Sequence, residues 1–258
     1  MLLRRVIEHV EAQNWTAILI DFVIVVVGVF IGIQVSNWND DRQSASRTQN
    51  YYNRLIDDLE SERRALLARL DYLDVTNKYG QSALVAFDDP AKMRSSKFLI
   101  DVYQASQIWT YSVQRATYDE ILASGIADAI PDSELRTQLA NVFLNAEAMR
   151  QVVVATTPYR QQIRLYLPNY IQVAIRERCS DRFIPTENSL LILELPENCG
   201  IEFREEQIAT AINALNEYPQ FERELVQRLA SIDVNRTAIE AHLLLIDSLI
   251  KELRTRLR

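Results

Sequence analysis

The sequence is poor in the residues that build tight turns, phosphate-binding loops and zinc sites. Its 258 residues include only five glycines, two histidines and two cysteines. So few glycines argue against an all-β fold with many tight turns. They also exclude the glycine-rich loops of dinucleotide- and triphosphate-binding proteins, whose patterns do not occur here. The histidines and cysteines are too few and too scattered for a zinc site of the finger type.

Positive charge is also in short supply. The chain has 28 basic and 35 acidic residues, with 24% charged and 48% hydrophobic residues, which is ordinary globular composition. The first 36 residues contain two bases and three acids, so the remainder holds 26 bases and 32 acids. This negative balance argues against a nucleic-acid partner.

One long hydrophobic run stands out at residues 17–36, and it contains a single charge, Asp21. Its length is that of one membrane-spanning helix. Trp15 and Trp38 bracket it and would lie roughly 35 Å apart along a helix, which suits the two interfaces of a bilayer. We therefore predict an uncleaved transmembrane helix. A buried helix of a soluble domain and a cleaved signal peptide are the alternatives, and the all-round apolar surface and the lack of small residues at a cleavage site disfavour them.

The flanking segments give the predicted topology. Residues 1–16 read as a short cytoplasmic amphipathic segment, and residues 37–258 as one helical domain. Basic residues flank the span on both sides, so the positive-inside rule gives only weak support for a cytoplasmic N-terminus. Cys179 and Cys199 enclose a proline-containing loop, and a disulfide between them would suit the periplasm. Two unrelated buried thiols are the alternative. We predict a single-pass protein of the bacterial inner membrane with a periplasmic domain.

One face of the predicted span carries the signs of helix association. At 100° per residue this face gathers Asp21, Val25, Gly28, Gly32 and Val35. Small residues allow close backbone approach in lipid, and an acid in a membrane usually faces protein or water. The expected partners are membrane lipid and either further copies of the chain or a larger membrane protein. Alternatively, Asp21 reaches the headgroups and the glycines are incidental.

The rest of the chain predicts an all-α fold, a helical bundle with long heptad-patterned helices. A first stripe begins at Ile56 and ends at Asp88-Asp89-Pro90. A second stripe near the C-terminus alternates steps of four and three, and only Arg236 breaks it. This stripe packs either inside an antiparallel bundle or in an intermolecular coiled coil. Its residues are Leu225, Leu229, Ile232, Ile239, Leu243, Ile246, Ile250, Leu253 and Leu257.

Shorter helices are predicted between the two stripes. Residues 95–108 fit one, Thr117-x-x-Glu120 is a capping-box candidate for the next, and Asp132 is placed to cap a long third helix. Prolines 158 and 168 would kink or divide this third helix. The only loop region expected is 179–202, with a short strand at 190–195, and a further helix covers about 204–217.

No catalytic set can be assembled from the sequence. His9 and His242 would lie on opposite sides of the membrane, and His242 reads as a packing or helix-surface residue. The acids from Asp57 to Glu62, interspersed with arginines, read as a solvated, salt-bridged helix face rather than as a glycosidase carboxylate pair. We therefore expect no catalytic residues, no metal site and no cofactor, and hence a protein that is not an enzyme.

Two segments carry a family resemblance. Residues 4–40 contain NWT followed by DFVIVVVGVFIGIQVSNWN, and residues 117–143 read TYDEILASGIADAIPDSELRTQLANVF. Both are similar to an uncharacterised family of bacterial inner-membrane proteins with a single span before a helical region. Ile121-Leu122-Ala123 departs slightly from the Leu-x-Ser of that family. The resemblance implies a single-span proteobacterial protein and implies no activity.

Two functional interpretations follow. The preferred one is a membrane-anchored, non-enzymatic helical protein that acts as an assembly, scaffold or accessory subunit. The other is a periplasmic module that senses a ligand or stress and signals through a partner. In that interpretation, aromatic residues of the middle helices would line a pocket, although such residues more often fill a bundle core. They are Tyr103, Trp109, Tyr111, Tyr118 and Tyr159.

Overall fold

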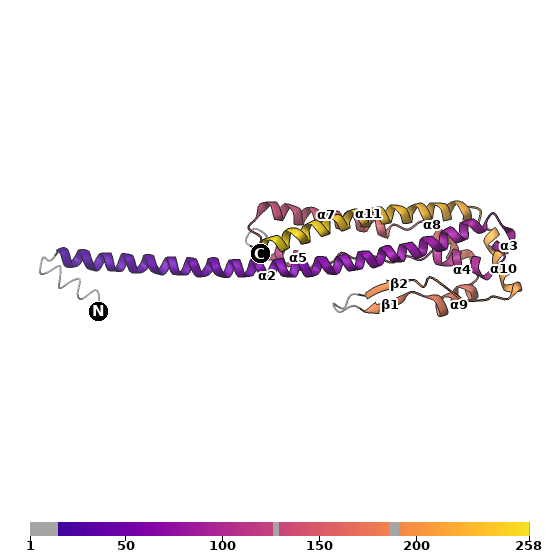
Figure 1. Ribbon diagram of the computed structural model, residues 1–258, viewed down its shortest axis with the longest axis horizontal. Helices are drawn as coiled ribbons and strands as arrows, with labels where there is room; N and C mark the ends of the chain where they lie inside the picture. Colours follow the sequence, from indigo (N-terminus) through magenta and orange to yellow (C-terminus); the bar gives the residue numbers. More distant parts are fainter. Residues whose placement is uncertain (1–14, 126–128, 186–190, 258) are drawn as a thin grey trace.

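The computed structural model describes residues 15–125, 129–185 and 191–257. The fold is all-α, with a long apolar N-terminal helix followed by a helical domain, which confirms the predicted fold class (Figure 1). Nearly all of the expected amphipathic segment 1–16 lies outside the described residues, and its last two residues open the first described helix.

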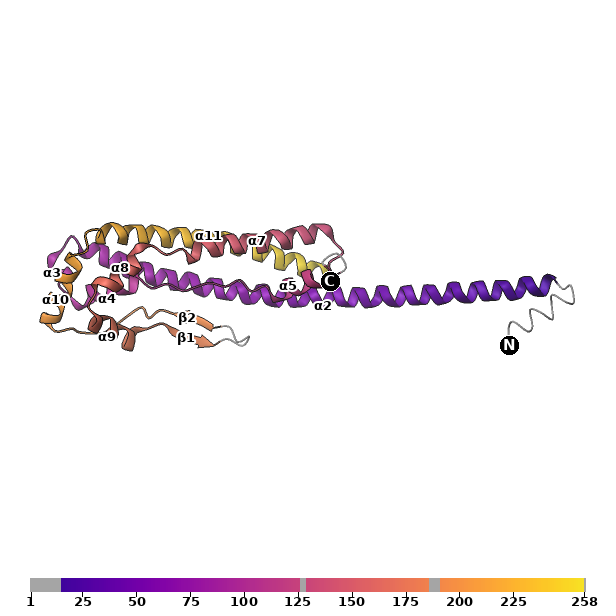
Figure 2. The ribbon, with the colours of Figure 1, turned by 180° about the vertical axis from the view of Figure 1, so that it is seen from behind.

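One helix, α2 (Trp15–Ala86), runs the length of the molecule. Its 72 residues correspond to about 110 Å at about 1.5 Å per residue. The N-terminal part of α2 projects alone from one end of the bundle, while its C-terminal part packs inside it (Figures 1 and 2). The helix ends where the sequence predicts, and Asp89 then caps the short helix α3 (Pro90–Met93) by accepting from Ala91 N at 3.0 Å.

The C-terminal stripe is buried within the chain. It lies on α11 (Phe221–Arg256), which packs along α2 and along α7 (Ser133–Val154). All stripe residues from Leu225 to Leu253 are buried, and Leu257 packs against their edge. The structure therefore uses this heptad pattern inside one chain, as an antiparallel bundle does.

Two hydrophobic clusters fill the domain. The first joins α2, α7 and α11 with α5 (Ala116–Ser124), where Tyr118 stacks on Phe143 with ring centroids 4.2 Å apart. The second lies at the end of the bundle away from the projecting helix, where Phe221 contacts Phe87 and Phe98. The helices that enclose the second cluster are α4 (Ser96–Ala105), α8 (Pro158–Tyr166), α9 (Asn169–Cys179) and α10 (Glu205–Asn216).

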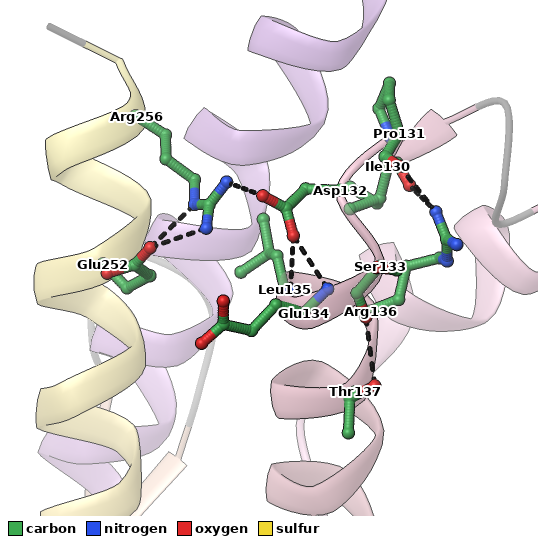
Figure 3. A network of polar contacts seen from close by, with 10 residues as sticks. All are labelled: Ile130, Pro131, Asp132, Ser133, Glu134, Leu135, Arg136, Thr137, Glu252 and Arg256. Carbon is green, nitrogen blue, oxygen red and sulfur yellow. Dashed lines mark hydrogen bonds and ion pairs between the residues drawn. The ribbon is translucent and has the colours of Figure 1, made fainter.

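A polar network joins the start of α7 to the end of α11 (Figure 3). Asp132 accepts from the backbone nitrogens of Glu134 and Leu135 at 2.8 and 3.0 Å, so it is the N-cap that the sequence predicts. Its second oxygen accepts from Arg256, which also pairs with Glu252 at 2.8 Å. Cap and ion pair together lower the pKa of the Asp132 carboxyl. This end of the bundle faces the projecting part of α2.

The short strand expected at 190–195 is confirmed, and it pairs with a second strand that the sequence did not predict. Strands β1 (Arg182–Pro185) and β2 (Leu191–Glu194) pair antiparallel, with Arg182 opposite Glu194 and Pro185 opposite Leu191. A disulfide between Cys179 and Cys199 joins the two ends of the segment that contains this hairpin. β2 lies against α2.

Two local predictions are wrong. Thr117 does not open a capping box, because α5 begins at Ala116 and Thr117 is buried inside the helix. The free backbone N–H at the start of α5 is instead satisfied by a residue distant in the sequence. Asp58 of α2 accepts a hydrogen bond from Thr117 N at 3.0 Å. The helix expected over 95–108 ends at Ala105, and an irregular connector follows from Ser106 to Arg115. Prolines 158 and 168 divide the chain as expected, at the starts of α8 and α9.

Candidate functional site

The predicted association face lies on the part of α2 that no other described segment covers. The helix is long and apolar enough to cross a membrane, and none of its most apolar window is buried inside the protein. A Cβ added at Gly28 or Gly32 would meet no atom within 4 Å. Val25 and Val35 are exposed, and Asp21 is partly exposed. The five residues thus share one open helix face.

Both predicted interface anchors are exposed on the same helix. Trp15 and Trp38 lie at the two ends of the apolar run, and the guanidinium of Arg42 is 6.0 Å from the ring centroid of Trp38. The first buried core residue of α2 is Tyr51. Residues 39–50 therefore form a stalk about 18 Å long between the apolar run and the bundle.

His242 is a packing residue, as the sequence predicts. Its ring is 1% exposed between α11 and α7, and its Nδ1 lies 2.9 Å from Asn145 Oδ1. Burial lowers the pKa of His242 to about 4, so the neutral ring is favoured. His9 lies outside the described residues. Among those that are described, no group of three or more metal-ligating side chains comes together.

One serine lies against a lysine, which is the pairing that some hydrolases use. Lys97 donates to both Ser82 and Asp101, and all three line a groove of about 430 Å³ between α2 and α4. The Asp101 side chain is 4% exposed, and its burial raises the pKa of that carboxyl. Lys97 is solvated and paired with Asp101, so its ammonium donates and has no lone pair with which to accept the serine proton.

The acidic row on α2 is not the uniformly solvated face that the sequence predicts. Glu60 pairs with Arg254 of α11, whereas Glu62 is 3% exposed. The Glu62 carboxylate accepts from the Tyr111 hydroxyl and from Gln114 N, the latter at 3.2 Å. Burial raises the pKa of Glu62, and these donors lower it in part. Glu62 thus anchors the connector between α4 and α5.

The aromatic residues of the middle helices mostly fill the two cores. All four tyrosines of this set, Tyr103, Tyr111, Tyr118 and Tyr159, are buried. The Tyr159 hydroxyl donates to Val102 O at 2.9 Å, and its ring stacks on Phe221. Trp109 is half-buried beneath the guanidinium of Arg69, at 4.2 Å.

No protein-family model, no curated protein and no solved structure matches this chain.

Four arginines that no sequence pattern groups together converge in the part of the bundle away from the projecting helix. Arg69 of α2, Arg160 and Arg164 of α8, and Arg228 of α11 all donate to residues 105–110. They are up to 159 positions apart in the chain, between 69 and 228. No spacing rule connects such residues, so no sequence pattern reveals them.

Proposed function

We propose that this protein is a membrane-anchored, non-enzymatic helical protein that serves as an assembly, scaffold or accessory subunit. It would cross the bacterial inner membrane once, with a cytoplasmic N-terminus and a periplasmic domain. The observation that carries the proposal is the continuity of α2, which is one helix from Trp15 to Ala86. The same helix thereby provides an uncovered apolar run and a central element of the folded bundle.

Burial energetics support a membrane around the N-terminal part of α2. From Leu19 to Val35 most of the large apolar side chains are about half exposed or more. Transfer of apolar surface out of water is favourable by roughly 25 cal/mol per Å². Exposing the apolar side chains of this helix segment to water would therefore carry a large free-energy cost. A lipid bilayer removes that surface from water, and the backbone hydrogen bonds of the helix are already satisfied internally.

The use of the heptad stripe inside the chain supports association through the span. Because α11 buries its stripe against α2 and α7, that stripe is not free to bind a second chain. The open face with Gly28 and Gly32 has no such intrachain partner among the described residues. In lipid, small residues promote helix association through close packing. The oligomer or membrane partner is therefore proposed to bind at this face.

A continuous helix also gives the subunit a mechanical role. Residues 39–50 lack a proline or glycine that would allow a bend, so a partner bound at the span fixes the direction of the whole domain. The disulfide between Cys179 and Cys199 supports the periplasmic location, since such bonds persist in oxidising compartments.

The experiment compares matched span variants extracted with native lipid. Gly28→Ile with Gly32→Ile blocks close approach on the proposed face. Val26→Phe with Ile33→Phe adds bulk on the opposite face as the control. We expect the glycine pair alone to reduce the native mass, or to release a stoichiometric co-purifying membrane protein. Unchanged mass and composition in the glycine variant, or equal loss in both variants, would overturn the proposed interface.

A further inference from the structure

The connector after α4 is held by arginines that approach it from different helices. Arg69 of α2 donates to Trp109 O and, at 2.8 Å, to Thr110 O. Arg228 of α11 donates to Ala105 O at 3.1 Å and to Gln107 O at 2.6 Å. Both arginines are buried, and both bind only neutral carbonyl groups in these contacts.

Two further arginines on α8 share one neutral acceptor. Arg160 Nη1 lies 3.4 Å and Arg164 Nη2 lies 3.1 Å from the same oxygen, Gln107 Oε1. Arg160 also donates to Ser106 O at 2.7 Å. An amide oxygen carries no formal charge, so it bridges the two cations without neutralising them. We call Arg160, Arg164 and Gln107 the α8 arginine site.

Within the part of the chain that the structure describes, the four arginines make no direct ion pair, although the buried Glu62 carboxylate acts on Arg69 from a longer distance. Among the described residues, no ion pair within 4.0 Å involves any of the four arginines, whereas eight other arginines of the domain are paired. The carboxylate that acts on both α8 arginines is Asp181, which accepts from the Tyr72 hydroxyl at 3.0 Å. Burial lowers the pKa of Arg164 and of Arg228 to about 10. Buried cations without counter-ions are costly, and proteins usually pair them.

Arg164 is held in position with one nitrogen free. Its guanidinium carbon lies 3.6 Å from the centroid of the Tyr103 ring, so the planar group is stacked on a rigid surface. Its Nη1 is buried and has no hydrogen-bond partner. A buried polar atom without a partner is uncommon in proteins, so this nitrogen has a donor hydrogen left for a ligand acceptor. Arg160 and Arg164 are each only partly buried, so the two side chains meet solvent, while Nη1 of Arg164 points into the protein.

We propose that the α8 arginine site binds a small oxyanion, either a phosphate or a carboxylate group of a soluble ligand. The free Nη1 of Arg164 would donate to the anion, and Arg160 would supply further charge from the same side. Guanidinium groups are suited to oxyanions because their planar array of donors matches two oxygens at once. This inference does not depend on the proposed membrane role, since it concerns the far end of the domain.

Anion binding at this site would strengthen the attachment of α8 to the connector between α4 and α5. The same arginines hold the connector through Ser106 and Gln107, and the connector joins α4 to α5. An anion between the guanidinium groups offsets their mutual repulsion, so the attachment of α8 to the connector becomes stronger. Asp181 opposes the anion, because its carboxylate carries the same sign of charge.

The test uses the full chain in lipid particles, titrated with inorganic phosphate, sulfate, acetate and chloride at constant ionic strength. Calorimetric binding and the unfolding temperature are measured together. We expect saturable binding and a rise in the unfolding temperature with an oxyanion but not with chloride. The phosphate and acetate arms distinguish a phosphate ligand from a carboxylate ligand.

Three variants make the test specific. Arg164→Lys keeps the charge and loses the planar donor array, so the affinity should fall at least tenfold. Asp181→Asn removes the competing carboxylate, so the affinity should rise. Arg150→Lys, on α7 outside the site, is the matched control and should bind like the wild type. Equal effects of chloride and oxyanions, or equal affinities of the Arg164→Lys and Arg150→Lys variants, would overturn the proposal.

Discussion

Leu229 of α11 packs directly over Gly80 of α2. A Cβ added at residue 80 would lie 2.6 Å from Leu229 Cδ2 and 3.6 Å from the Cβ of Ala105 on α4. Three helices therefore meet at a point where a hydrogen atom fits and a methyl group does not. The absence of a side chain at Gly80 thus permits this close contact of α2 with α11.

Replacing Gly80 should weaken this contact. Gly80→Val inserts a branched side chain against Leu229, and overpacking of this kind costs about 1–3 kcal/mol. The melting temperature should fall by roughly 2–4 °C per kcal/mol for a domain of this size. Gln81→Val, at the exposed neighbouring position, is the control and should change stability by less than about 0.5 kcal/mol. A melting temperature that is the same in both variants would contradict the observed packing.

Adjacent leucines of α11 test the intrachain use of the heptad stripe. Leu243 is 9% exposed and Leu244 is 72% exposed. Leu243→Ala should destabilise the protein by about 2–4 kcal/mol because it leaves a cavity, whereas Leu244→Ala should be nearly neutral. Denaturant unfolding at several protein concentrations measures both. Stability of the wild type that rises with concentration, together with loss of association in Leu243→Ala, would instead indicate an intermolecular coiled coil.

His242 should make the domain sensitive to acid. Its folded pKa of about 4 lies below the value of 6.5 for an exposed histidine, so on acidification the unfolded chain takes up the proton first. Stability should therefore fall as the pH drops from 6.5 to 4, by up to about 3 kcal/mol from this residue. His242→Gln, which does not titrate, should lose less stability over that interval. Subtracting the stability profile of the variant from that of the wild type removes the contributions of carboxylates such as Asp101. If this difference in stability does not change with pH, His242 is not the source of the acid sensitivity.

The cysteine pair should be oxidised in intact cells. A thiol reagent added to denatured protein should label neither Cys179 nor Cys199 until a reductant is supplied. Replacing both residues with serine should cost about 3 kcal/mol, the value expected for a closed loop of this length. Immediate labelling of both thiols without reduction would argue against the bond and against the periplasmic topology.

The features that the sequence predicted correctly depend on neighbours in the chain. The end of α2 before Pro90, the Asp132 cap and the stripe of α11 follow from local backbone rules and from helical periodicity. The errors occur where a distant segment changes the environment. Asp58 binds the start of α5, so Thr117 is not needed as a cap. Tyr111 and Gln114 surround Glu62, so a residue expected in water is buried.

The sequence by itself determined the all-α class, the apolar run with its tryptophan borders and the two long helical stripes, because each depends on composition and on a repeat of 3.5 to 3.6 residues. Only the tertiary structure decided that the C-terminal stripe is buried within the chain, and that four arginines converge on residues 105–110. The physical reason is that pairing between helices, and the meeting of charges from separate helices, depend on how the chain folds back on itself. No local pattern of residues encodes that path.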